Sequence, residues 1–267
     1  MKIKFHHKYI STLGFKVVGT FLYGSQNYGL DTKDSDIDAK CIVLPSFENI
    51  VKNNTPVSQV IQDFAVRQNI KVKDQIDVKD IRVMFEQYRK QNISFLETLF
   101  SEHMYIEPQY EELFAPILEN KEKIARYDVH TAIKAIVGMA SQKYKAMEHP
   151  YSSLKEKIDK YGYDSKQLHH ILRLEELLHS YINKVPFEKC LKPTTLKEYL
   201  MEVKDYKYNL STARRVAEQS MKNIDKLKAI GLSSNSKSIY KTEVDEILDD
   251  VLMKIMKKNL MKEFKSC

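Results

Sequence analysis

Cysteine and long apolar runs are both scarce in this 267-residue sequence. The three cysteines, Cys41, Cys190 and Cys267, lie far apart and form no CxxC pair. This spacing argues against a zinc ribbon or a disulfide framework and indicates a reducing compartment. No apolar stretch approaches the roughly 20 residues that a membrane-spanning helix needs, and the N-terminus, MKIKFHHKYI, lacks the apolar core of a signal peptide. We therefore expect a cytoplasmic protein with no membrane partner.

Acidic residues are fewer than basic ones, 36 against 43, so the net charge is +7. A mild basic excess is compatible with partners that carry phosphate, although many proteins without such partners are equally basic. The hydrophobic content of 43% is typical of a globular chain. The length is sufficient for one large domain or two modest ones.

Strand patterns are concentrated in the first hundred residues. Three runs predict strands: 15–23, 37–44 and 70–78. In the third run the alternation changes phase at Asp74-Gln75, which indicates a hairpin turn or a bulge. From Lys79 the pattern becomes helical, and Asn92 is placed to cap a further short helix over 92–100.

Helical periods dominate after Pro108. They occupy four segments: 110–120, 129–147, 165–182 and 210–227. A Gly/Ser-rich break over 231–238 predicts a flexible loop. The capping box TEVD, 242–245, then begins a last amphipathic helix over 240–265, which must pack on its own domain or on a partner.

These patterns predict an α+β protein with two domains. A small mixed β-sheet domain occupies residues 1–108, and an α-helical domain occupies residues 109–267.

Aspartates crowd the stretch YGSQNYGLDTKDSDIDAK, residues 23–40. Residues two apart in a strand point to the same face, so Asp36 and Asp38 are expected side by side, with Ile37 facing the other way. Two adjacent carboxylates repel each other unless a cation lies between them. Mg²⁺ prefers hard oxygen ligands and commonly takes one or two carboxylates together with substrate phosphates. The pair therefore predicts a metal site, with a solvated Asp-rich turn as the alternative.

Gly24 and Ser25 precede this pair at the end of the first predicted strand. Glycine lets the backbone approach a phosphate closely, and the Ser25 hydroxyl with nearby N–H groups can form an anion-binding concavity. A turn-capping hydroxyl is the alternative role for Ser25. A phosphate-binding corner followed by a carboxylate pair suits in-line phosphoryl displacement, in which two metal ions hold the attacking and the leaving oxygen.

This arrangement resembles the signature of the DNA polymerase β-like nucleotidyltransferases. That signature is a hydrophobic residue, Gly, Gly or Ser, about ten residues, and then Asp, hydrophobic, Asp. Here it reads Tyr23-Gly24-Ser25 and then Asp36-Ile37-Asp38. The resemblance implies a palm-like catalytic domain and a third carboxylate on a later strand. Asp77 is the best match, and Asp74 and Asp80 are the competitors; the alternative role of Asp77 is to cap the following helix.

A weaker resemblance extends over about residues 15–180. Residues 76–100 are similar to a branch of predicted nucleotidyltransferases that has an Asn-Pro-x-x-Leu-Glu-like segment, although Ile93 stands in place of the proline. Some members of that branch are encoded beside RNA ligases. Residues 163–178 are similar to its second-domain helix, in which Lys, His and Arg recur at similar spacing.

The downstream resemblance adds candidate nucleotide ligands. Lys166, His169 (or His170) and Arg173 recur at helical spacing, so some of them share a face that either contacts nucleotide or faces solvent. Lys40 extends the face of Asp38 and either touches phosphate or is a solvated edge lysine. Arg214-Arg215 and the lysines of 254–265 are expected on solvated helix faces, with RNA contact as the alternative.

We predict a metal-dependent nucleotidyltransferase. Asp36, Asp38 and Asp77 are expected to hold two Mg²⁺ or Mn²⁺ ions, and Gly24 and Ser25 to hold the phosphates of a nucleoside triphosphate. A hydroxyl acceptor attacks the α-phosphate and pyrophosphate leaves. RNA is the favoured acceptor and protein a possible one, with the helical domain forming the other wall of the cleft.

Two alternatives stay open at this point. One is a catalytically silent nucleotide- or RNA-binding module, and the other is an antitoxin-like protein that modifies or masks a protein partner. The sequence does not reveal the base preference, the acceptor, the number of nucleotides added or the oligomeric state.

Overall fold

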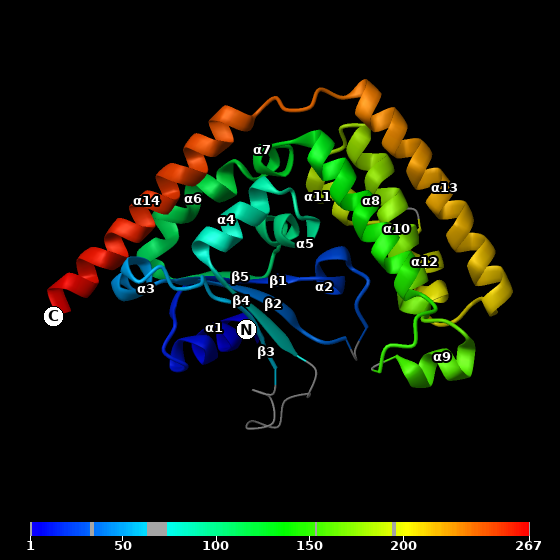
Figure 1. Cartoon of the computed structure of the whole chain (residues 1–267), viewed down its shortest axis with the longest axis horizontal. Helices are drawn as coiled ribbons and strands as arrows, with labels where there is room; N and C mark the ends of the chain where they lie inside the picture. Colours follow the sequence, from blue (N-terminus) through cyan, green and yellow to red (C-terminus); the bar gives the residue numbers. More distant parts are fainter. Residues whose placement is uncertain (1, 33–34, 63–73, 153, 194–195, 267) are drawn as a thin grey trace. The chain divides into compact units, whose positions relative to one another are not determined.

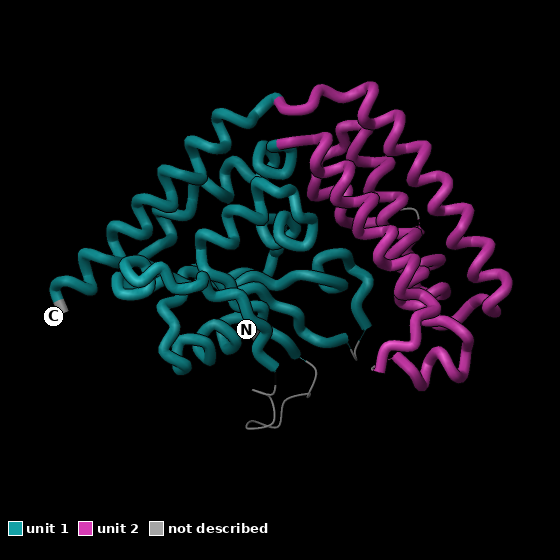
Figure 2. The backbone as a smooth tube through the Cα atoms, viewed as in Figure 1, with its two compact units in different colours: residues 1–127, 239–267 teal, residues 128–238 magenta. Residues whose placement is uncertain are grey.

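The computed structural model describes residues 2–32, 35–62, 74–152, 154–193 and 196–266. The chain divides into two compact units, which Figure 2 colours separately. Unit 1 comprises residues 1–127 and 239–267, and unit 2 comprises residues 128–238. No helix among the described residues is both long enough and apolar enough to cross a membrane.

Unit 1 is built on a five-stranded mixed sheet in the order β3-β4-β2-β1-β5 (Figure 1). The strands are β1 (Lys16–Tyr23), β2 (Asp38–Leu44), β3 (Ser58–Ile61), β4 (Gln75–Asp80) and β5 (Met104–Ile106). Strands β2 and β4 are parallel, and the other neighbouring pairs are antiparallel. The first two predicted strands are confirmed within a residue. Of the third, β4 covers the second half, and residues 70–73 lie outside the described part of the chain.

The two faces of this sheet differ in chemistry. Helix α1 (Lys2–Thr12) covers the face that carries Ala39, Cys41 and Val43 from β2 and Ile76 and Val78 from β4, all of them buried. Helices α4 (Ile81–Arg89) and α5 (Ile93–Leu96) lie on the opposite side of the sheet (Figure 1). The alternation of strand residues places Asp38 and Lys40 of β2, and Gln75, Asp77 and Lys79 of β4, on that opposite face.

Shorter elements complete the sheet part of unit 1. They are α2 (Ser25–Tyr28), α3 (Phe47–Val51) and the 3₁₀ turns η1 (Glu97–Phe100) and η2 (Pro108–Tyr110). Helices α6 (Glu111–Glu119) and α7 (Lys121–Ala125) follow.

The last helix, α14 (Lys241–Ser266), also belongs to unit 1, so the domain boundary expected at residue 108 is displaced. Buried side chains and ion pairs hold α14 there. Val244, Leu248, Val251 and Ile255 are buried, and Arg89 of α4 contacts Asp245 at 2.8 Å. A local sequence pattern shows that a helix is amphipathic but does not show which domain buries its apolar face. Helix α14 also begins before Thr242, so TEVD lies inside the helix instead of capping it.

Unit 2 is entirely helical in its described residues. Its helices are α8 (Val129–Ala146), α9 (Lys155–Tyr161), α10 (Ser165–Ile182), α11 (Phe187–Leu191), α12 (Lys197–Lys204) and α13 (Leu210–Ser234). Helix α13 continues through the first half of the predicted loop over 231–238. A Cβ at Gly231 would lie 2.7 Å from Ile182 and 2.9 Å from Ile133, so glycine permits the close packing of α13 on α10 and α8. Tertiary packing here outweighs the weak helix propensity of the Gly/Ser-rich segment.

Candidate functional site

The corner between β1 and α2 requires a glycine. Gly24 has φ 86° and ψ −149°, a backbone conformation that side chains disfavour. A Cβ at this position would also lie 3.3 Å from Asp38 Oδ2. The structure therefore brings the predicted phosphate-binding corner, Gly24 and Ser25, next to the second aspartate of the predicted pair.

Asp38 is the first residue of β2 and lies between β1 and β4. Its register partners are Tyr23 on one side and Gln75 on the other, and Gln75 Nε2 donates a hydrogen bond to Asp38 Oδ1 at 2.6 Å. Asp36 lies just before the strand, as it does before the predicted strand 37–44, so only Asp38 of the pair is in regular β structure. The segment is held by Ile37, whose N–H donates to Asp74 Oδ1 at 2.8 Å.

Asp77 is on the same face of the sheet as Asp38, because Asp38 pairs with Gln75 and Lys40 pairs with Asp77. Both oxygens of this buried carboxylate lie next to lysines. Lys40 Nζ is 2.9 Å from Oδ2, and Lys79 Nζ is 2.9 Å from Oδ1.

The two competing acids are engaged in other contacts. Asp74 accepts the hydrogen bond from Ile37 and lies 3.4 Å from His6 Nε2. Asp80 caps α4 by accepting a hydrogen bond from the Arg82 N–H, and it pairs with the Arg82 guanidinium at 2.7 Å. The helix-capping role considered for Asp77 therefore belongs to Asp80, and Asp77 is the acid that shares a face with Asp38.

Lys40 is buried, with 3% of its surface exposed, so its interpretation as a solvated edge lysine is wrong. Its ammonium lies 4.1 Å from the ring centre of Tyr23 and 4.2 Å from that of Phe95. Burial lowers the pKa of Lys40, and the neighbouring Asp77 opposes this shift. Burial raises the pKa of Tyr23, and Asp38, Asp77 and Glu97 add to the rise. These residues form one compact electrostatic cluster on the sheet face.

Glu97 is a site residue to which the sequence reasoning assigned no role. It is buried, accepts a hydrogen bond from the Gly24 N–H at 3.3 Å, and accepts another from the Tyr28 hydroxyl. The carboxylate thus ties both ends of the α2 corner to η1. The available signal was its place in NISFLE, the segment that the family resemblance singles out.

The side chains of Asp36 and Asp38 are of a type that binds divalent cations. The described acidic residues, however, do not form a complete coordination site. Asp36 and Asp38 offer the hard oxygen atoms that Mg²⁺ prefers, and the absence of a side chain at Gly24 leaves space beside Asp38. Within the described ranges, no group of three or more His, Cys, Asp or Glu residues is placed to hold one ion. Each oxygen of Asp77 lies beside a lysine, so a metal contact from Asp77 would add to or replace these lysine contacts.

The candidate ligands on α10 belong to unit 2 and differ in environment. Lys166 is exposed, whereas His169 and Arg173 are 4% and 5% exposed. The expectation of a solvated helix face is therefore wrong for the last two. His169 Nδ1 hydrogen-bonds the Leu200 carbonyl at 2.9 Å, and burial is the main cause that lowers its pKa to about 4. His169 is thus a neutral residue packed within unit 2.

Comparison with known proteins adds a family to this geometry. Residues 5–229 match the sequence model of the RNA repair pathway DNA polymerase beta family. A nucleotidyltransferase-like protein from Exiguobacterium sibiricum has a similar crystal structure, with a TM-score of 0.29, 10% sequence identity, and coverage of 100% of this chain and 80% of that one. No curated protein sequence matches this chain.

Proposed function

Because this chain belongs to the RNA repair pathway DNA polymerase beta family, we propose that it transfers a nucleoside monophosphate from a nucleoside triphosphate to a hydroxyl group of RNA. One observation carries the proposal: the Gly24-Ser25 corner packs against Asp38, on the same sheet face as Asp77. The sequence signature of polymerase β-like enzymes gives the order of these residues, and the structure adds the proximity of Gly24 to Asp38. The association of this family with RNA repair supports RNA over protein as the acceptor.

The residues of the phosphate-binding corner and the aspartates near it each have a role in this reaction. Gly24 and Ser25 hold the β- and γ-phosphates, and Asp36 and Asp38 hold Mg²⁺ or Mn²⁺. Bound divalent cations supply charge neutralisation at the attacking and leaving oxygens. The acceptor oxygen forms a bond to the α-phosphorus, the bond to the β-phosphate oxygen breaks, and pyrophosphate leaves. Asp77 orients the acceptor hydroxyl and receives its proton.

Lys40 and Lys79 keep Asp77 in place before substrate binds. Each ammonium compensates the carboxylate charge that burial would otherwise penalise. Glu97 and Tyr28 hold the phosphate-binding corner in its turned conformation. Nucleotide contacts from Lys40, Lys166, His169 and Arg173 stay predictions.

Label transfer tests the proposal. The protein is incubated with each α-³²P-labelled NTP, Mg²⁺ or Mn²⁺, total RNA and a protein lysate, beside the Asp36→Ala/Asp38→Ala variant. We expect label on RNA that disappears in the variant. Label on protein instead would replace RNA as the acceptor, and absence of label with every nucleotide and metal would refute the transferase function.

A second candidate, a silent nucleotide- or RNA-binding module, is favoured by a specific observation. Both oxygens of Asp77 face lysines, and no three-residue metal group is present in the described residues. This arrangement keeps the fold but leaves the third carboxylate neutralised. Nucleotide binding that persists equally in the native chain and in the Asp36→Ala/Asp38→Ala variant, without label transfer, identifies this module.

A further inference from the structure

The second half of α14 presents a groove lined by lysines. A cavity of about 650 Å³ runs along this helix, and η2 and α6 contribute Gln109 and Leu113 to its lining. Met261 also lines it, and its remaining lining residues are the lysines Lys254, Lys257, Lys258, Lys262 and Lys265. No acidic residue is among the lining residues of this lysine groove. Leu113, Met261 and the methylene stems of the lysines make most of its surface apolar, but its charged groups are all basic. An anionic partner is the chemistry that these charged groups fit.

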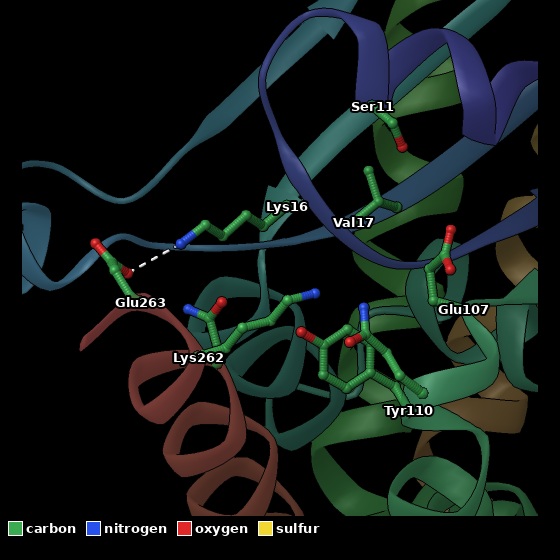
Figure 3. Close-up of a pocket in the computed structure, with 9 residues that line it drawn as sticks. Ser11, Lys16, Val17, Glu107, Tyr110, Lys262 and Glu263 are labelled. Carbon is green, nitrogen blue, oxygen red and sulfur yellow. Dashed lines mark hydrogen bonds and ion pairs between the residues drawn. The ribbon is translucent and has the colours of Figure 1, made fainter. Parts of the chain in front are cut away.

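A neighbouring cavity contains lysines but differs from the lysine groove, because acidic residues also line it. This cavity of about 350 Å³ shares Gln109 and Lys262 with the lysine groove, but Glu107 and Glu263 also line it (Figure 3). Lys16 Nζ contacts Glu263 at 2.9 Å, as the dashed line in Figure 3 shows. Cationic and anionic groups thus balance in the smaller cavity, and this balance is missing from the lysine groove.

Charge is distributed unequally along α14. Its first turns carry acids that pair with other elements of unit 1: Glu243 pairs with Lys123, and Asp249 pairs with Arg89. Its later turns carry the five groove lysines and one acid, Glu263. The acidic end is therefore used in packing, whereas the lysine end lines an open groove.

Two ordinary explanations do not account for all of these lysines. Favourable interaction of lysine with the helix dipole is limited to about the last turn, so it does not reach Lys254 or Lys257. Intramolecular pairing accounts for Lys254, which contacts Asp250 at 2.7 Å, and for Lys258, which donates to the Gln109 carbonyl at 2.6 Å. For Lys257, Lys262 and Lys265, the described residues provide no ion-pair partner.

We propose that the lysine groove binds the phosphate backbone of RNA. From Lys254 to Lys265 the helix rises about 16 Å, which is long enough for its lysines to reach more than one phosphate of an RNA strand. Lysines that neutralise phosphates release condensed counterions and so contribute affinity without reading sequence. The inference rests on the proposed RNA acceptor. It also lies beyond the family match, which ends at residue 229.

RNA is favoured over a lipid surface because α14 lacks an apolar face to insert. Its exposed large apolar side chains are Met253, Met261 and Phe264, and the Phe264 ring packs against Phe47 with centroids 4.9 Å apart. Helices that lie in the membrane interface instead combine a basic face with a broad apolar one.

The test measures binding of a fluorescent, unstructured 30-nucleotide RNA by anisotropy over a range of salt concentrations, with EDTA and without NTP. The variant Lys257→Gln/Lys262→Gln/Lys265→Gln is compared with Lys222→Gln/Lys226→Gln/Lys228→Gln on α13, which changes the net charge equally. We expect the α14 variant to lose at least about tenfold in affinity near 100 mM salt. The slope of log K against log salt should fall by about 2, since each contact to single-stranded nucleic acid contributes about 0.7. The α13 variant should keep the native slope.

Other results overturn the inference. Equal losses in the two variants would indicate a general charge effect, and native binding by the α14 variant would exclude the groove. Absence of RNA binding by the native chain would also refute it, whether or not the chain binds phosphatidylserine vesicles. Crosslinking the native chain to 4-thiouridine RNA gives an independent check, because the crosslinked peptides should fall within 254–265. Since no NTP is present, RNA binding can hold even if label transfer fails, so the two proposals fail separately.

Discussion

Polar residues are buried in both units of this protein, but the two units compensate them differently. On the sheet face of unit 1, Asp77 lies between Lys40 and Lys79, and Asp38 accepts a hydrogen bond from Gln75. On α10 of unit 2, His169 is buried as a neutral ring that hydrogen-bonds a backbone carbonyl.

The two arrangements suit different roles: buried ion pairs suit a reactive site, and a buried neutral side chain with one hydrogen bond suits packing. A buried ion pair is weak evidence for stability, because desolvation offsets much of its attraction. Such a pair is expected where a site needs a charge in a defined place. A buried neutral histidine with one backbone hydrogen bond satisfies the simpler requirement that buried polar groups have partners. Unit 2 also buries a charged residue, Arg173, so the comparison favours the sheet face of unit 1 for the proposed reaction without excluding charge from the core of unit 2.

The largest expected effect concerns activity in unit 1. Asp38→Asn keeps an acceptor for Gln75 but removes a carboxylate, so label transfer should fall by at least about 10³-fold, the factor that corresponds to about 4 kcal/mol of transition-state stabilisation. Single-turnover label transfer measures the rate, and thermal unfolding checks that the variant is folded. Full activity in this variant would remove the sheet face from the chemistry.

The next effect concerns stability in the same cluster. Lys40→Met removes a counter-ion of the buried Asp77 carboxylate, and the free energy of unfolding should fall by about 3 kcal/mol. Urea denaturation measures the loss. Lys79→Met is the matched control, with a smaller loss because the Lys79 side chain is 14% exposed whereas that of Lys40 is 4% exposed. Equal losses in the two variants would contradict the greater importance of the more buried pair.

In unit 2 the expected effect depends on pH. The pKa of His169 is lowered to about 4 from 6.5, so the unfolded chain binds more protons than the folded chain between these values. His169 therefore contributes stability that is present above about pH 6.5 and is lost as pH falls toward 4, by up to about 3 kcal/mol at about 1.4 kcal/mol per pKa unit.

Unfolding free energies of the native chain and His169→Gln, measured from pH 7 to pH 4, check this contribution. The variant should show a shallower decline on acidification, because glutamine does not titrate. The remaining decline includes His170, whose pKa burial also lowers. Parallel declines in the two proteins would show that His169 titrates normally.

The smallest effect compares one tyrosine hydroxyl in each unit. Tyr28→Phe removes a hydrogen bond to Glu97, and Tyr163→Phe removes one to the Tyr208 carbonyl. Each variant should lose about 1 kcal/mol in unfolding free energy. Only Tyr28→Phe should raise KM for the NTP, by a few-fold, because Tyr28 supports the phosphate-binding corner. A KM change of the same size in Tyr163→Phe would show that the effect is not specific to the corner.

Much of the fold followed from local pattern. Alternating and helical periods located β1, β2 and the long helices α8, α10 and α13, because side-chain period reports directly which face of an element is buried. The predictions that failed depended on contacts between distant segments. Gly231 continues a helix because Ile133 and Ile182 pack against it, and α14 joins unit 1 because its buried face and its acidic first turns contact that unit.

The sequence by itself determined the order and spacing of Gly24, Ser25, Asp36 and Asp38, since all four belong to one short stretch of the chain, residues 24–38. Only the tertiary structure decided which of Asp74, Asp77 and Asp80 shares a sheet face with Asp38, and that Lys40 is buried against Asp77. The contact of Glu97 with the Gly24 corner was also decided there. The physical reason is register. The pairing of parallel strands β2 and β4, separated by a long connection, sets which side chains share a face, and a shift of one residue would exchange them.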